Sequence, residues 1–185
     1  MSTIFVIRHA EKPDGAVNGI DASGAADPES LTVQGWQRAG ALAVFFGSQQ
    51  GLPAPNQIYA SDPHKEKAAG QDKVGSKSQR PVETVTPLAA RLNQTINQTH
   101  AKGDEAQLAA DVVQLHGITL ICWQHEAIPR IATLIMGSPT GIPDPWPSDR
   151  FDVVWCFERS AESGPWTFTQ VCQCVLAGDR STPIG

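Results

Sequence analysis

The fold of this chain is constrained most strongly by an uninterrupted run of β-branched and aromatic side chains, Thr3 to Ile7. The run does not alternate between apolar and polar residues, as a strand with one solvated face would. Such continuity is typical of a strand buried on both faces of a parallel sheet, because helices cover both faces of that sheet. A second run, Gly117 to Trp123, has the same character. The two runs predict an α/β fold.

Helical patterns separate the predicted strands. An apolar series with helical spacing follows Thr32 and stops at Gly47, which predicts the first helix. The segment Gln57 to Ala60 predicts a short second strand. Residues 81 to 92 predict two short helical pieces, because Pro87 is expected to interrupt a helix. This alternation of strands and helices favours a mainly parallel sheet.

The remaining pattern adds two helices and a hairpin. Asp104 is expected to begin a helix that ends near residue 116, and a further helix is expected to stop at Gly137. Two strand-like runs, 151–157 and 166–176, surround a turn rich in serine and glycine and predict an antiparallel hairpin. We therefore expect a three-layer α/β/α sandwich with a mainly parallel central sheet and a C-terminal antiparallel hairpin at its edge.

Length and composition fit one domain over residues 1–185. The 185 residues are 41% hydrophobic and 18% charged, which is ordinary globular usage, and one core typically serves about 100 to 200 residues.

Two long loops interrupt the regular elements. Residues 13–30 form an acidic loop that could act as a lid, and a lysine-rich insertion is expected around residues 62–79. The insertion is interpreted as a solvated loop, with a flap that steers phosphate as the alternative.

The overall charge excludes some partners. A net charge of -5 at pH 7 provides no general attraction for nucleic acid or for an acidic membrane, so an anionic ligand needs a local cluster of cations. No apolar run approaches the roughly 18 residues of a membrane-spanning helix, and the first residues lack a signal-peptide pattern. The four cysteines lie in strand-like stretches and are expected to be reduced thiols of a cytoplasmic protein rather than zinc ligands: Cys122, Cys156, Cys172 and Cys174.

Side chains suited to phosphate chemistry lie just after the predicted strands. Arg8 and His9 follow the first strand, and His125 follows the strand that ends at Trp123. Arg80 begins the helical region after the second strand, where a helix N-terminus also favours an anion. Because open parallel sheets bind ligands beyond the carboxyl ends of their strands, these side chains are expected to meet in one crevice.

His9 is the candidate nucleophile. A substantial fraction of imidazole is uncharged at neutral pH, and it can accept a phosphoryl group to give a phosphohistidine that water later hydrolyses. The phosphoryl oxygens carry charge, so transfer depends on positioning and on stabilisation by groups such as guanidinium, whose paired donors match these oxygens. Arg8 is adjacent to His9 and suits this role.

Four motifs together resemble the histidine phosphatase superfamily, the phosphoglycerate mutase-like group. They occur in the family's order: Arg8-His9-Ala10-Glu11 after the first strand; Leu31-Thr32 with Gly35 and Gln37-Arg38-Ala39; Ser78-Gln79-Arg80-Pro81 with Glu83-Thr84; and Leu120 to His125. The matches cover roughly residues 3 to 137. The resemblance implies a phosphohistidine at His9, with the phosphoryl oxygens held by Arg8, Arg80 and His125. It implies neither a cofactor nor a metal ion.

The sequence departs from the superfamily's pattern at three places. Ala10 replaces the usual glycine of the signature. Additional residues separate Asp62-Pro63 from Arg80. The extra segments by which true mutases hold a phosphoglycerate are missing, and this favours hydrolysis.

The proton donor for the leaving group is the least defined part of the predicted site. Mutase-like members supply a glutamate after the second arginine's helix, and residues 89–104 show no clear counterpart. Glu126 directly follows His125, at the place where the acid phosphatase branch of the superfamily carries its acidic proton donor. The alternative is that Glu126 only stabilises a helix N-terminus. Glu105 and Glu11 are weaker candidates.

The sequence therefore predicts a metal-independent phosphatase that hydrolyses a phosphomonoester, or a related small phosphorylated compound, through His9. One alternative is a phosphoglycerate mutase-type phosphotransferase, in which the phosphoryl group passes to another hydroxyl rather than to water. Another is a non-catalytic phosphate-binding module that keeps the arginine pocket without turnover. Neither a nucleic acid nor a membrane is expected as a partner.

Overall fold

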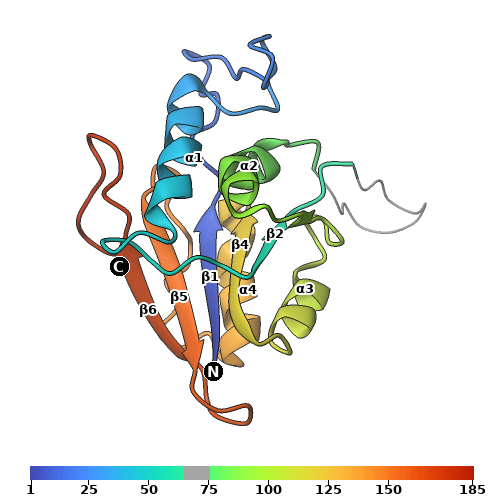
Figure 1. The fold of residues 1–185 in the computed structure, drawn as a ribbon, viewed down its shortest axis with the longest axis vertical. Coiled ribbons are helices and arrows are strands. Elements are labelled where there is room, and N and C mark those ends of the chain that lie inside the picture. Colours follow the sequence, from blue (N-terminus) through green and yellow to red (C-terminus); the bar gives the residue numbers. More distant parts are fainter. Residues whose placement is uncertain (65–75) are drawn as a thin grey trace.

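The computed structural model describes residues 1–64 and 76–185, which are arranged around a central sheet (Figure 1). The strands follow the order β3-β2-β4-β1-β5-β6. The first four along the chain run parallel to one another, whereas β5 is antiparallel to β1 and β6 is antiparallel to β5. Their bounds are β1 Ser2–Arg8, β2 Gln57–Ala60, β3 Ile96–Asn97, β4 Gly117–Trp123, β5 Val153–Arg159 and β6 Thr167–Cys172.

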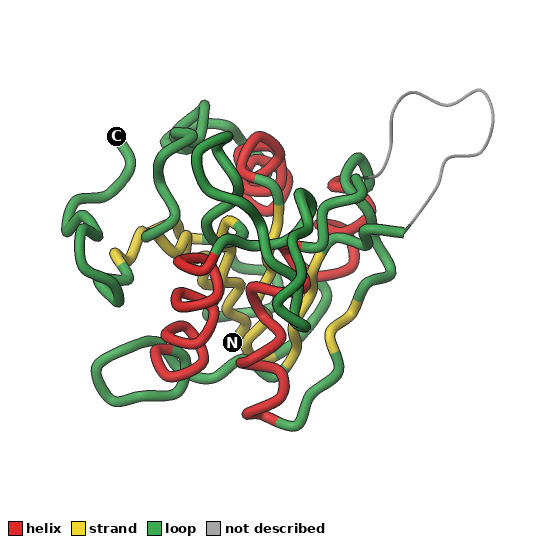
Figure 2. The backbone as a smooth tube through the Cα atoms, turned by 90° about the horizontal axis from the view of Figure 1, so that it is seen from above, coloured by secondary structure: helices red, strands yellow, loops and turns green. Residues whose placement is uncertain are grey.

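Helices cover both faces of the sheet, and the view from above shows them on either side of the strands (Figure 2). α1 (Val33–Phe45) and α2 (Arg80–Leu92) pack on one face, and α3 (Glu105–Val112) and α4 (Ile128–Met136) pack on the other. The predicted three-layer sandwich with an antiparallel hairpin at the sheet edge is therefore confirmed. None of the described helices is both long and apolar enough to cross a membrane.

The residues of β1 alternate between two hydrophobic clusters. Phe5 and Ile7 join the core beneath α1 and α2, whereas Ile4 and Val6 join the core beneath α3 and α4. All residues of β1 are buried. The uninterrupted apolar run of the sequence therefore reflects a strand that has a core on each side.

α2 is a single helix rather than the two predicted pieces. Pro87 lies inside it, where a proline removes one backbone hydrogen bond and typically costs about 3 kcal/mol. Val85, Leu88 and Ala89 are nevertheless buried against α1 and the sheet. This packing outweighs the local preference of proline.

Other boundaries also differ from the sequence prediction. α3 ends at Val112 instead of near residue 116, because turns from Val112 to Leu115 redirect the chain into β4. β3 is a short edge strand that no pattern predicted. The hairpin begins later than expected, so Phe151 lies in the loop before β5. Residues 65–75 of the predicted insertion lie outside the described residues.

The acidic loop, residues 13–30, is anchored at its base beside α1 (Figure 1). Trp36 Nε1 donates to Ile20 O at 2.7 Å, and Asp27 N donates to Gly19 O at 3.0 Å. A Cβ at Gly19 would lie 2.1 Å from Asp27 O, so this close approach of two backbone segments requires glycine. The role of the loop as a lid stays a prediction.

Candidate active site

The carboxyl ends of β1 and β4 bring three predicted site residues together. The strands are parallel neighbours, with Arg8 opposite Trp123. His9 N donates to Trp123 O at 3.0 Å, which extends this pairing by one residue. His125 begins the short 3-10 helix His125–Ala127 that leads into α4. Strand register therefore places both histidines at the same end of the sheet.

His9 is almost fully buried, with 3% of its surface exposed. Its Nδ1 lies 2.7 Å from Ala10 O, and because a carbonyl oxygen can only accept, Nδ1 carries the proton and Nε2 keeps its lone pair. Burial lowers the pKa of His9 to about 3, and the positive charges of Arg8 and Arg80 act in the same direction, whereas the backbone hydrogen bond opposes them. The imidazole is therefore uncharged at neutral pH, as a nucleophile requires.

Arg8 presents two unpaired donors. The residue is 1% exposed, and its Nη1 donates to Ser148 O at 2.6 Å and to Arg150 O at 3.2 Å. The guanidinium carbon lies 3.8 Å from the centre of the Phe151 ring, and burial lowers the pKa of Arg8 only to about 10, so the group stays charged. Nε and Nη2 are buried with no hydrogen-bond partner among the described residues. Such donors are costly when unmatched, and their fork suits a phosphoryl group.

Arg80 begins α2 and holds the base of the acidic loop. Its Nε donates to Ser30 O at 3.2 Å and its Nη1 to Ser78 Oγ at 3.1 Å, while Nη2 donates to Pro28 O. Burial lowers the pKa of Arg80. The charge of Arg80 reaches His9, whose pKa it helps to lower. The charge of Arg80 thus acts on His9, while the donors of Arg80 are held by loop carbonyls and a serine hydroxyl.

Two threonines fix the turn that follows His9. Ala10 N donates to Thr84 Oγ1 at 2.8 Å, and this hydroxyl donates in turn to a carbonyl of α2. Thr32 N donates to Glu11 O at 3.0 Å, and Thr32 Oγ1 caps α1 by accepting from Gly35 N at 3.1 Å. A Cβ at Gly35 would lie 2.6 Å from Glu11 O. These contacts explain why the motifs around α1 and α2 accompany the Arg-His pair.

Glu126 lies between His125 and Lys102. Its Oε2 is 2.9 Å from His125 Nδ1, and its Oε1 contacts Lys102 Nζ. Contact with His125 and with Lys102 holds the pKa of Glu126 well below its ordinary range, although burial acts in the opposite direction. The carboxyl is therefore ionised at neutral pH. Sequence reasoning missed Lys102, which lies between β3 and α3 in a loop without a readable pattern.

The two weaker candidates for the proton donor have structural partners. Glu105 is buried and accepts from Trp123 Nε1 at 3.0 Å and from Gly103 N at 2.8 Å. Glu11 forms an ion pair with Arg38 at 2.8 Å. Of the three carboxylates, Glu126 is the one in contact with His125. In the part of the chain that the structure describes, no group of three or more His, Cys, Asp or Glu residues could hold a metal ion.

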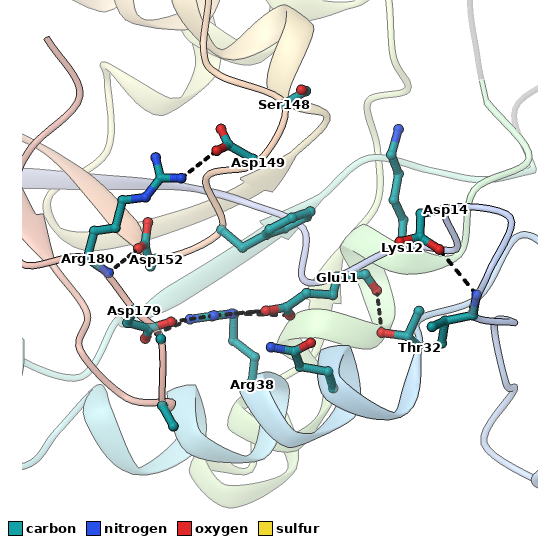
Figure 3. A pocket seen from close by; sticks show the side chains of 15 residues that line it. Glu11, Lys12, Asp14, Thr32, Arg38, Ser148, Asp149, Asp152, Asp179 and Arg180 are labelled. Atoms are coloured by element: carbon teal, nitrogen blue, oxygen red, sulfur yellow. Dashed lines mark hydrogen bonds and ion pairs between the residues drawn. The ribbon is translucent and has the colours of Figure 1, made fainter.

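A pocket of about 490 Å³ adjoins the Arg8 end of the site (Figure 3). Its walls come from the loop after β1, the start of α1, the loop before β5 and the C-terminal segment. Phe151 lines the pocket, and its ring centre lies 6.4 Å from that of His9. Glu11, Arg38 and Asp179 form a row of ion pairs along one side. No sequence pattern predicted this pocket, because the loop before β5 is irregular.

Comparison with known proteins finds matches among solved structures. No protein-family model and no curated protein matches the chain. The protein histidine phosphatase SixA, solved with tungstate, matches with a TM-score of 0.57 and 16% identity, over 93% of this chain and 97% of that chain. A phosphoserine phosphatase from Entamoeba histolytica, solved with phosphoserine, matches with a TM-score of 0.53 and 17% identity, over 91% and 95%. A phosphoglycerate mutase from Plasmodium falciparum matches with a TM-score of 0.55 and 11% identity, over 98% and 97%.

The chain shares an α/β/α sandwich with these solved structures. These solved structures are members of the histidine phosphatase superfamily, and the chain has the fold of that superfamily. The fold that the sequence motifs implied is thus confirmed. Because both phosphatases and a mutase share this fold, the fold alone does not define the reaction.

Proposed function

We propose that the chain is a phosphatase that hydrolyses a phosphomonoester, or a related small phosphorylated compound, through a phosphohistidine at His9. One observation carries this proposal: the buried, uncharged imidazole of His9 directly follows Arg8, whose charge acts on it and whose Nε and Nη2 are buried without a hydrogen-bond partner among the described residues. A nucleophile beside an oxyanion site meets the two main requirements of phosphoryl transfer. The tungstate and phosphoserine bound by two proteins of the same fold support a small phosphorylated substrate.

The proposed reaction has two steps. Nε2 of His9 attacks phosphorus, so that an N–P bond forms, and the P–O bond to the alcohol breaks as the leaving oxygen takes up a proton. Arg8, Arg80 and His125 hold the other phosphoryl oxygens, with Arg80 exchanging loop carbonyls for phosphate. Water then attacks phosphorus, the N–P bond breaks, and inorganic phosphate leaves while His9 is restored.

Glu126 is the proposed proton donor, and it must first gain a proton. Its pKa is low because of His125 and Lys102. A phosphate dianion near Arg8 would draw His125 and Lys102 towards itself, and its own negative charge would raise the pKa of Glu126. Glu126 therefore becomes protonated as the substrate binds, and after it has donated this proton it can act as the base for water.

The first test compares wild type with His9→Ala on an aryl phosphate in the presence of a chelator. We expect wild type to release phosphate and to gain an acid-labile, base-stable phosphoryl label, and His9→Ala to do neither. His116→Ala is the matched control, because it changes an exposed histidine at the opposite end of β4. Equal activity in wild type and His9→Ala would exclude His9 as the nucleophile. Loss of activity on chelation would show that the reaction needs a metal.

The second test concerns the leaving group. Glu126→Gln should slow an unactivated alkyl ester by about 100-fold or more, the usual effect of a general acid, and leave an activated aryl ester nearly unchanged. The reason is that a good leaving group departs without a proton. An equal loss on both esters would assign Glu126 to the orientation of His125 instead.

A phosphoglycerate mutase-type phosphotransferase is the second candidate, favoured by the likeness to the Plasmodium falciparum mutase. In that reaction the phosphoryl group on His9 passes to a hydroxyl of an acceptor, and a bisphosphorylated sugar acid keeps the protein phosphorylated. Phosphate transfer to an added acceptor, measured against phosphate release to water, separates the two. A phosphate-binding module without turnover would bind phosphate and show no label on His9.

We also propose a cytoplasmic location. Its four cysteines are free thiols, and disulfides persist mainly in oxidising compartments. Burial raises the pKa of the Cys156 thiol to about 12 and raises the pKa of Cys122 further, so both thiols stay protonated and unreactive.

A further inference from the structure

We propose that the pocket beside Arg8 holds the alcohol part of the substrate and that this part carries an ammonium group. The inference rests on the proposed function, because it assigns the phosphoryl group to the His9 end of the same site. The substrate class that follows is a small phosphomonoester of an amino alcohol.

The pocket and the phosphoryl end share a wall. Phe151 lines the pocket while the Arg8 guanidinium stacks on its ring, and Ser148 lines the pocket while its carbonyl accepts from Arg8 Nη1. Glu11 also lines the pocket, and its charge acts on Arg8. Phe151 and Ser148 therefore border both Arg8 and the pocket, which Arg8 and His9 themselves do not line, and a group esterified to a phosphate on Arg8 would extend past these two residues into the pocket. Its volume of about 490 Å³ leaves room for more than a phosphoryl group and lies within the usual range for small ligands.

The side chains that line the pocket are more acidic than basic. The acidic ones are Glu11, Asp14, Asp149, Asp152 and Asp179, and the basic ones are Lys12, Arg38 and Arg180. Arg180 pairs with Asp149, and Arg150, from outside the lining, pairs with Asp152 at 2.7 Å, so these charges cancel locally. Lys12 is exposed at the rim, where water and salt screen its charge.

The excess negative charge belongs to the row Glu11, Arg38 and Asp179, where two carboxylates share one guanidinium. Asp179 Oδ2 accepts from Arg38 and from two backbone N–H groups, whereas Glu11 Oε2 accepts from Arg38 Nε alone among the described residues, at 3.2 Å. Glu11 Oε2 thus keeps acceptor capacity at the pocket. An ammonium group offers three donors and the matching charge. Because the row is largely buried, salt screens this attraction little.

The test uses three alkyl esters of similar size that differ in one terminal group. 2-Aminoethyl phosphate ends in an ammonium, propyl phosphate in a methyl and 2-carboxyethyl phosphate in a carboxylate. We expect kcat/KM to be highest for the ammonium ester, at least about fivefold above propyl phosphate, as one favourable charge contact predicts, and lowest for the carboxylate ester. Aryl phosphate, which has no terminal charge, reports phosphatase activity independently.

The esters also differ in intrinsic reactivity. Comparing the ratio of their kcat/KM values between wild type and variants of the pocket cancels this difference. Glu11→Gln should lower the ratio of kcat/KM for the ammonium ester to that for propyl phosphate by about threefold or more. Asp14→Asn removes a charge at the rim and leaves the buried row unchanged. Its side-chain oxygen can still accept from the backbone N–H groups of Ala16 and Val17, so the turn is kept. This variant should lower the ratio less than Glu11→Gln. Glu162→Gln, at the exposed tip of the hairpin, should leave the ratio unchanged.

The outcomes separate the inference from the function on which it rests. Hydrolysis of aryl phosphate without any preference for the ammonium ester overturns the inference and leaves the proposed function standing. A preference that Glu11→Gln and Asp14→Asn both leave intact also overturns it, because the ammonium is then bound elsewhere. If wild type neither hydrolyses aryl phosphate nor gains the label on His9, both the proposed function and the inference are refuted.

Discussion

Replacing Arg38 by methionine should lower the free energy of unfolding by about 3–5 kcal/mol. Methionine keeps the apolar stem but removes the cation from between Glu11, at 2.8 Å, and Asp179, at 2.7 Å. Both carboxylates then stay buried without a counter-charge, and breaking a buried ion pair in this way typically costs that amount. Domains have only about 5–15 kcal/mol of total stability, so the variant should be close to marginal.

The loss should depend on pH in a definite direction. Burial alone would raise the pKa of Asp179, but contacts with Arg38 and the backbone lower it below the ordinary 3.8. A carboxyl whose pKa is depressed in the folded state stabilises the fold above its unfolded pKa, and this stabilisation is lost as the pH falls through the folded value. In Arg38→Met the Asp179 carboxyl takes up a proton more readily, because the largest contact that lowers its pKa is lost. The difference between wild type and variant should therefore be full at pH 7 and should shrink as the pH falls towards 3.8.

Urea unfolding at both pH values measures this effect. With a slope of about 2 kcal/mol per molar urea, the midpoint at pH 7 should fall by about 2 M. Arg130→Met, which changes an exposed arginine of α4, is the matched control and should change stability by less than about 0.5 kcal/mol. Adding Glu11→Gln and Asp179→Asn to Arg38→Met should restore part of the loss. A loss below about 1 kcal/mol at pH 7, or one that grows as the pH falls, would refute this reasoning.

Three further predictions concern the proposed nucleophile His9, the wall of the pocket and the start of α1. Because His9 has a pKa of about 3 against an ordinary 6.5, the unfolded state binds more protons below pH 6.5. The free energy of unfolding of wild type should therefore fall relative to that of His9→Gln as the pH drops from 6.5 towards 3, by up to about 1.4 kcal/mol per pH unit. Urea unfolding over this pH range measures the difference, and a constant difference between the two proteins would contradict the prediction. Phe151→Ala should weaken phosphate binding by about three- to tenfold in calorimetry, because Arg8 loses the ring on which it stacks; unchanged affinity would show that the ring does not position Arg8. Thr32→Ala should lower stability by about 1 kcal/mol in urea unfolding through loss of the cap on Gly35 N, whereas Thr32→Ser should retain most of it.

Local patterns predicted the layers of the fold but not the details that depend on packing. β1 and β4 were predictable because strands buried on both faces carry their signal within a few consecutive residues. The continuity of α2 through Pro87 was not, because it depends on contacts with α1 and the sheet that lie far away in the sequence. β3 is too short to carry a pattern of its own.

The same distinction applies to the site. Arg8, His9 and His125 could be expected to meet, because parallel strands end at the same edge of a sheet and each residue directly follows such a strand. Phe151 and Lys102 could not be predicted, because both lie in irregular loops. No sequence pattern indicates that these loops lie near the site. Their contacts with Arg8 and Glu126 exist only through the tertiary structure.

The register between β1 and β4 has a consequence for engineering the chain. Side chains of a strand alternate between its two faces, so Arg8 continues the side of Ile4 and Val6, and His9 continues the opposite side. Deleting or inserting one residue within β1 would exchange these sides and remove the arginine and the histidine from their places at once. Replacing a buried side chain of β1 by another of similar volume keeps both in place. The site should therefore withstand many substitutions in β1 and no change in its length.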